Sequence, residues 1–85
     1  MKEFSYTIKD PLGIHARPAG LFVKKMQEFS SEVMVARGAE GCDAKKLLAL
    51  MKLRIKTGET ITLRINGADE EAAVGAAEAF LSENL

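Results

Sequence analysis

The sequence predicts an α+β domain in which an antiparallel or mixed sheet is covered on one side by helices. Two observations favour this class. Short segments alternate between apolar and polar residues, which is the period of a half-buried strand. Other segments place apolar residues three and four positions apart, as amphipathic helices do. The length of 85 residues suits one core, so a single domain over residues 1–85 is expected.

The first half of the chain is expected to contain a strand, a helix and a hairpin. The strand covers residues 2–9, where apolar and polar side chains alternate until a proline and glycine turn. The apolar stripe that follows predicts a helix that starts at His15 and ends near Glu28. The sequence SEVMVA then predicts a second strand, and a glycine turn leads into a short third strand around residues 41–43.

The second half is expected to contain two helices separated by one strand. The sequence KKLLALMKL, at residues 45–53, is too rich in apolar residues for a one-sided strand and predicts a two-turn helix. Alternation over residues 60–65 predicts the fourth strand. Acidic residues at 69–71 open the last segment and suit the N-terminus of an amphipathic helix. The predicted order is therefore β-α-β-β-α-β-α.

Composition excludes several classes of function and site. Twelve basic and twelve acidic residues cancel, so no binding to nucleic acid or to a membrane surface is expected. Cys42 is the single cysteine, which excludes an internal disulfide and a structural zinc site. No metal or cofactor is expected. Because no apolar run is long enough for a signal peptide or a membrane span, a cytoplasmic protein is expected.

The stretch DPLGIHARPAG contains the only histidine, His15, at the expected start of a helix. Gly13 allows a tight approach of the chain, and Pro18 lies in the first turn, where a missing amide hydrogen costs nothing. The amides of Ala16 and Arg17 are then free to bind an anion at the positive end of the helix dipole. The guanidinium of Arg17 matches phosphate oxygens, so a phosphate site is predicted.

The chemistry expected of His15 is nucleophilic attack on phosphorus. The helix dipole disfavours the charged imidazolium, so a neutral ring with a free lone pair is expected. A hydrolytic triad would need a nucleophile and an orienting carboxylate, and a metal site several ligands, and neither set is evident. Three alternatives stay open: Cys42 as a nucleophile with His15 as its base, a structural histidine, and an Arg17 that is only solvated.

The motif Gly13-Ile14-His15-Ala16-Arg17-Pro18-Ala19 resembles the phosphorylation site of HPr, the histidine-containing phosphocarrier of the bacterial phosphoenolpyruvate:sugar phosphotransferase system. Length, element order, the helix at 45–53 and the acidic start of the last helix extend the resemblance over the whole chain. It implies an open-faced β-sandwich, with a four-stranded antiparallel sheet covered on one face by three helices. It also implies a carrier and not an enzyme. Such a carrier takes a phosphoryl group from phosphorylated Enzyme I onto Nδ1 of His15, where Arg17 stabilises it, and passes it to the IIA domains of sugar permeases.

The helix at 45–53 has more apolar residues than one face can bury. Leu50 and Leu53 can serve the core, and the resemblance implies that the others dock Enzyme I and IIA domains. The expected partner surface comprises Ala16, Gly20, Lys24, Lys46, Leu47, Leu48, Met51 and Lys52. A basic rim suited to acidic partners is expected from Arg17, Lys24, Lys46, Lys52 and Arg54. The alternative, that all five apolar residues are core, stays open.

Three positions depart from the family pattern. Lys46 occupies the position of a serine that a dedicated kinase phosphorylates in many relatives, and a lysine cannot accept that phosphate. Leu12 stands where a polar residue often orients the histidine or the phosphate. Arg54 stands where glycine is common. These departures concern regulation and the choice of partner more than phosphoryl transfer.

Two other functions remain open. The chain could serve a paralogous regulatory branch, such as the nitrogen-linked one, with the same chemistry. It could also be a small binding module for RNA or a metal. Phe4 and Tyr6 fall on the core-facing period, which leaves no visible stacking platform for RNA. A monomer is expected.

Overall fold

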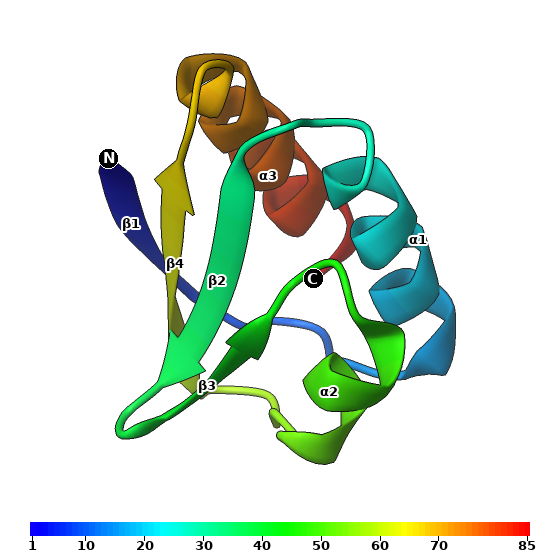
Figure 1. The fold of residues 1–85 in the computed structure, drawn as a ribbon. Helices are drawn as coiled ribbons and strands as arrows, with labels where there is room; N and C mark the ends of the chain where they lie inside the picture. The colour runs from blue at the N-terminus through cyan, green and yellow to red at the C-terminus, as the bar shows by residue number, and fades with distance from the viewer.

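The computed structural model covers residues 1–85 and contains four strands and three helices (Figure 1). The elements are β1 (Lys2–Thr7), α1 (Ala16–Met26), β2 (Glu32–Arg37), β3 (Glu40–Asp43), α2 (Leu47–Lys52), β4 (Thr60–Asn66) and α3 (Glu70–Asn84). The predicted order of elements is confirmed. None of the helices is both long enough and apolar enough to cross a membrane.

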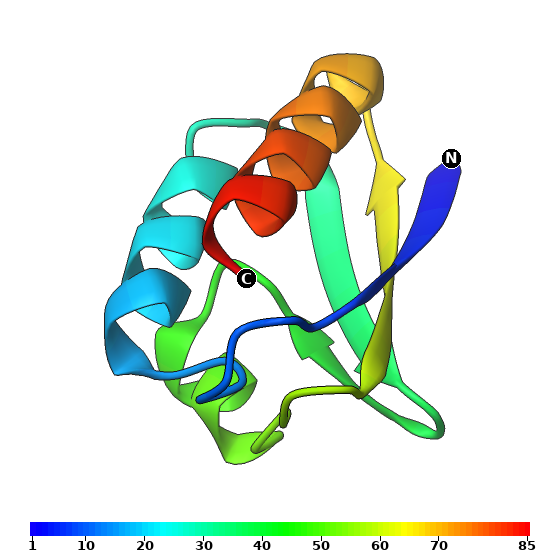
Figure 2. The same cartoon turned by 180° about the vertical axis from the view of Figure 1, so that it is seen from behind.

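The strands form one sheet in the order β1-β4-β2-β3. Every neighbouring pair is antiparallel, so the sheet is antiparallel and not mixed. Leu63 of the central strand β4 lies opposite Phe4 of β1 and Val35 of β2. Figures 1 and 2 show the helices on one side of this sheet, which leaves its other face open. The chain therefore has the open-faced sandwich that the resemblance implied.

The core lies between the sheet and the helices. Alternate residues of β2 and β4 point toward the helices and are buried: Val33, Val35, Ile61, Leu63 and Ile65. The apolar stripes of α1 and α3 cover them, as their helical spacing predicts. The rings of Phe22 on α1 and Phe80 near α3's end are 5.4 Å apart and join the two helices. Leu50 adds the buried side of α2.

Strand β1 is shorter than predicted, because the chain leaves the sheet after Thr7. The amide of Ile8 still donates to the carbonyl of Glu59, but the amides of Lys9 and Asp10 donate to Leu85 instead. Residues at the far end of the sequence thus redirect the chain toward α1. This turn brings Asp10 and the loop after it to the helix that carries the predicted site.

Helix α2 is also shorter than the predicted 45–53. At its start, the carboxylate of Asp43 accepts the Lys45 amide at 2.8 Å and Lys46 is extended, so the helix begins at Leu47. At its end, Arg54 has a left-handed backbone, with φ of 49°. This conformation suits glycine best, which explains why glycine fits position 54. Helix α2 therefore has six residues, Leu47–Lys52.

Candidate functional site

His15 is the N-cap residue of α1, so the helix begins at Ala16, one residue after the predicted start. Its backbone is extended, with φ of −115° and ψ of 173°, and its carbonyl accepts the amide of Ala19 at 2.9 Å. The preceding loop is held by Ile14, whose amide donates to the carbonyl of Ile55 at 3.0 Å. Backbone hydrogen bonds on both sides therefore hold the main chain of His15 at the N-terminus of α1.

Gly13 is required for this loop to pack. Its φ is 68°, and a Cβ there would lie 2.5 Å from the carbonyl oxygen of Ile55 and 2.8 Å from the Cα of Lys56. Both contacts are to backbone atoms, which cannot move aside as a side chain can. The glycine predicted to allow a tight approach thus positions His15 against the segment that follows α2.

Two backbone amides at the start of α1 have no acceptor. Neither Ala16 nor Arg17 donates a backbone hydrogen bond within the protein, and Pro18 has no amide hydrogen to donate. Ala16 and Arg17 are both exposed, and the Arg17 guanidinium is in no ion pair. Free amides at a helix N-terminus, with a guanidinium beside them, are a favourable setting for a phosphate.

The imidazole of His15 has one partner in the protein, which is the carboxylate of Asp10. Nε2 lies 3.6 Å from Oδ2 of Asp10, and the two side chains are 37% and 23% exposed. Nδ1 has no hydrogen-bond partner. Asp10 was missed in the sequence, where no orienting carboxylate was evident beside the histidine. The only available signal was its position at the start of the same turn.

Cys42 has the wrong electrostatic environment for a nucleophile. Burial, together with the charge of Asp43, raises the pKa of its thiol. Reactive cysteines need the opposite shift, because the thiolate is the nucleophile. Cys42 lies in the edge strand β3, whereas the side-chain partner of His15 is Asp10. The alternative of a cysteine nucleophile loses its support.

The structure also places no three His, Cys, Asp or Glu side chains where they could hold a metal ion together.

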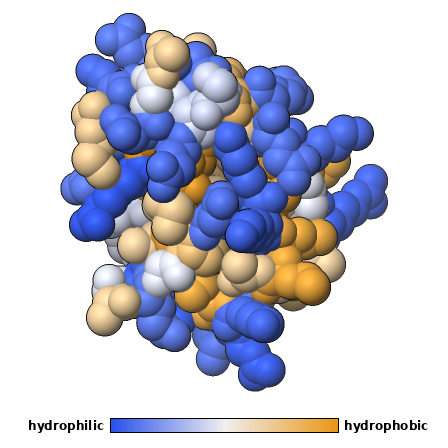
Figure 3. All heavy atoms as spheres, viewed as in Figure 1, coloured by the Kyte–Doolittle hydropathy of each residue, from blue (hydrophilic) through white to orange (hydrophobic).

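Helix α2 exposes part of its apolar surface. Leu50 and Leu53 are buried, as expected, whereas Leu48 is 77% exposed and Leu47 is 39% exposed. The side chain of Met51 is only partly exposed, because it packs against the core. Apolar side chains gather at the lower right of Figure 3, where Figure 1 places α2 and the start of α1. The alternative that all five apolar residues are core is therefore wrong.

Two exposed leucines near this region were not predicted. Leu12, in the loop before His15, is 73% exposed, and Leu21, on α1, is 52% exposed. Helices α1 and α2 pack against each other. The exposed leucines of both helices and of the loop are named the apolar patch below: Leu12, Leu21, Leu47 and Leu48.

The five predicted basic side chains are all exposed, and none forms an ion pair. They are Arg17, Lys24, Lys46, Lys52 and Arg54. Lys45 differs from them, because its ammonium donates to the carbonyl of Phe29 at 2.6 Å. Gly20 is half-buried in α1, and a Cβ there would meet no atom within 4 Å. The unpaired cations leave the surface near α1 and α2 positively charged.

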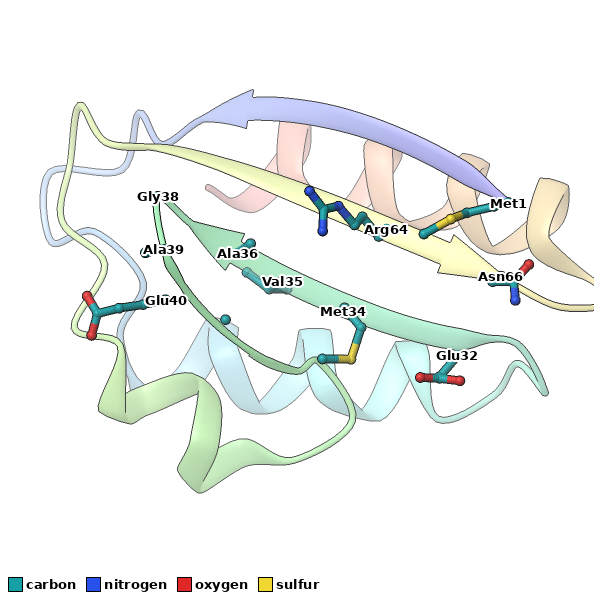
Figure 4. Close-up of a pocket in the computed structure, with 11 residues that line it drawn as sticks. Met1, Glu32, Met34, Val35, Ala36, Gly38, Ala39, Glu40, Arg64 and Asn66 are labelled. Atoms are coloured by element: carbon teal, nitrogen blue, oxygen red, sulfur yellow. The ribbon is translucent and has the colours of Figure 1, made fainter.

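The open face of the sheet has a separate pocket of about 420 Å³ (Figure 4). Met34, Arg64 and Asn66 line it on the side turned away from the helices. None of the predicted site residues lies there. The His15 side chain is instead 37% exposed and lines none of the pockets, which suits a reaction between two proteins better than the enclosure of a small substrate.

Comparison with known proteins finds relatives that match this chain over nearly its whole length. A family model described as the PTS HPr component phosphorylation site matches residues 2–83. The phosphocarrier protein HPr of Mycoplasma genitalium is 43% identical over 86 residues, with 99% of this chain and 97% of the relative covered.

Two solved structures of phosphocarriers superpose closely on the chain. HPr-C-His from Thermoanaerobacter tengcongensis has a TM-score of 0.93 at 36% identity, and the match covers 98% of this chain and 93% of that one. A mycoplasma histidine-containing phosphocarrier protein has a TM-score of 0.93 at 32% identity, with 96% and 93% covered. The chain is thus similar to these phosphocarriers in both fold and sequence over nearly its whole length.

Proposed function

The chain belongs to the HPr family of phosphocarriers of the phosphotransferase system, and we propose that it carries the phosphoryl group on Nδ1 of His15. The chain is a phosphoryl carrier and not a catalyst of turnover. The proposal concerns which atom accepts the group, which residues stabilise it, and which proteins give and take it.

The observation that carries the proposal is the setting of His15 at the start of α1. Its Nδ1 has no partner, and the two amides that follow it have no acceptor. A phosphoryl group attached to Nδ1 brings negative oxygens to the end of a helix where donors and the dipole favour them. Arg17 adds a guanidinium whose donors match phosphate oxygens.

The transfer needs only one histidine from this chain. The lone pair of Nδ1 forms the bond to phosphorus, while the bond between phosphorus and the donor breaks and leaves its electron pair on the donor. Onward transfer reverses these roles, with His15 as the leaving group.

We propose phosphorylated Enzyme I as the donor and IIA domains of sugar permeases as the acceptors, with the relay in the cytoplasm. The apolar patch, with Met51 at its edge, supplies area that a partner can cover. The unpaired cations around it favour partners with acidic surfaces and speed their encounter at low salt. Ala16, Gly20, Lys24, Lys46 and Lys52 lie on the same two helices or next to them.

A reconstituted relay tests this proposal. Phosphoenolpyruvate and purified Enzyme I are expected to add one acid-labile phosphoryl group to the protein, as read by intact mass. After Enzyme I is removed, a purified IIA domain should take that group. Failure of either step, with a known HPr as the positive control, contradicts the proposed partners. Faster uptake from a nitrogen-linked Enzyme I would place the chain in the regulatory branch.

A further inference from the structure

We propose that Asp10 is a positioning residue that keeps the proton of neutral His15 on Nε2 and so leaves the Nδ1 lone pair free to attack. The inference rests on the proposed role of His15 as acceptor. It assigns a function to a carboxylate outside the motif that carries the resemblance, and the contact between the two side chains is its starting point.

Asp10 is held in place by three hydrogen bonds. Its amide donates to Leu85 and its carbonyl accepts the amide of Gly13, each at 2.9 Å. Its Oδ1 accepts the amide of Leu12 at 2.8 Å. These contacts fix the side chain as an Asx turn. Only Oδ2 is left over, and it faces Nε2 of His15 at 3.6 Å.

A carboxylate that faces one ring nitrogen selects the tautomer, because it accepts hydrogen bonds and cannot donate them. The proton is favoured on Nε2, and the lone pair then belongs to Nδ1. At 3.6 Å the contact is longer than a hydrogen bond and acts through the charge of Asp10. Such contacts are often long in the resting protein and tighten in the reacting complex.

Asp10 also acts on the product of the step. The bond from Nδ1 to phosphorus forms, the bond from phosphorus to the donor breaks with its electrons on the donor, and the Nε2 proton stays. The ring of His15 therefore gains positive charge as the phosphoryl group arrives. The amides at the start of α1 and the Arg17 guanidinium disfavour that charge, and Asp10 is the carboxylate that offsets them.

Two substitutions separate this role from a structural one. Asp10→Asn keeps Oδ1 for the Leu12 amide but turns an NH₂ group toward Nε2. That donor favours the proton on Nδ1, which is the wrong tautomer for attack. Asp10→Ala removes both interactions. A positioning role therefore predicts that the Asn variant is slower than the Ala variant, whereas a purely structural role predicts the reverse order.

Asp43→Asn is the matched control, because Asp43 makes the same turn contact without a histidine. Its Oδ1 accepts the amide of Lys45, two residues ahead, at 2.8 Å. We expect the maximal rate of phosphoryl uptake to fall about tenfold in Asp10→Asn and about threefold in Asp10→Ala, modest values because both groups are partly exposed. Asp43→Asn should match the unmodified protein, and KM for the donor should not change in any of them.

Nitrogen NMR of the imidazole supplies a second readout, and the single histidine makes its assignment unambiguous. In the neutral ring we expect the proton on Nε2 in the unmodified protein and a shift toward Nδ1 in Asp10→Asn. An unchanged tautomer in Asp10→Asn, or an Ala variant slower than the Asn variant, overturns the inference. The tautomer is measured without any donor, so its outcome is separate from whether His15 is the acceptor. Phosphoryl uptake by His15→Ala would contradict only the proposed function.

Discussion

The carboxylate of Asp69 accepts hydrogen bonds from both the amide and the hydroxyl of Ser31, and so joins the start of α3 to the loop before β2. The amide of Ser30 donates to the other carboxylate oxygen at 2.9 Å. The Ser31 hydroxyl contributes most to lowering the pKa of Asp69 from its ordinary 3.8 to about 2, and the Ser30 amide is second. The charged form is therefore the one that the fold binds.

This contact predicts a pH dependence of stability. Because the pKa of Asp69 is lowered in the folded state, its contribution is fully present above about pH 4 and is lost as the pH falls toward about 2. Asp69→Asn should lower the free energy of unfolding at neutral pH, and the difference from the unmodified protein should shrink across that window. Urea unfolding at several pH values measures it. A difference that stays constant with pH would show that the charge of Asp69 is not involved.

Gly13 and Gly75 provide a matched pair of glycine substitutions. A Cβ at Gly13 meets two backbone atoms, whereas at Gly75, inside α3, it meets nothing within 4 Å. Gly13→Ala should cost about 1–3 kcal/mol through backbone strain and clash. Gly75→Ala should raise stability by up to about 1 kcal/mol, because alanine favours helix. Urea unfolding reads both, and a Gly13→Ala protein as stable as Gly75→Ala would contradict the described loop.

Substitutions at Leu48 and Leu50, both on α2, are predicted to distinguish an effect on partner docking from an effect on stability. Leu48 is 77% exposed and Leu50 is 2% exposed. Leu50→Ala should lower stability by about 2–5 kcal/mol, because it leaves a cavity. Leu48→Ala should leave stability within about 0.5 kcal/mol but raise KM for phosphorylated Enzyme I. An unchanged KM would remove Leu48 from the docking surface.

Arg17 should matter for transfer and not for folding. Its side chain is exposed and in no ion pair, and the phosphate that it is proposed to bind is absent from the resting protein. Arg17→Ala should slow phosphoryl uptake while the melting temperature changes by only a few degrees. Arg17→Lys should recover part of the rate, since it keeps the charge but loses the planar fork. A large drop in melting temperature would identify a structural arginine instead.

The parts of the fold that follow local rules were predictable from sequence. Alternation placed β1, β2 and β4, a glycine turn indicated β3, and the turn at Gly13 with Pro18 marked the start of α1. The end of β1 was not predictable, because it depends on contacts with Leu85, 76 residues beyond Lys9. The approach of Asp10 to His15 follows from the same redirected chain.

The candidate site shows the same division. The free amides after His15 follow from the local sequence, because Pro18 and the helix start fix them. The half-buried position of Met51 depends on how α2 packs, which periodicity in so short a helix does not determine. Leu21, by contrast, lies off the buried stripe of α1, so its exposure could have been predicted. Local motifs therefore predicted the setting of His15 better than the surface around it.

The most direct test of the account is to locate the phosphoryl group on the protein. After incubation with phosphoenolpyruvate and Enzyme I, nitrogen and phosphorus NMR should show one phosphoryl group bonded to Nδ1 of His15. The His15→Ala protein, confirmed as folded by its amide spectrum, should gain no phosphoryl mass under the same conditions. A phosphoryl group found on another residue, or uptake by His15→Ala equal to that of the unmodified protein, would contradict the account.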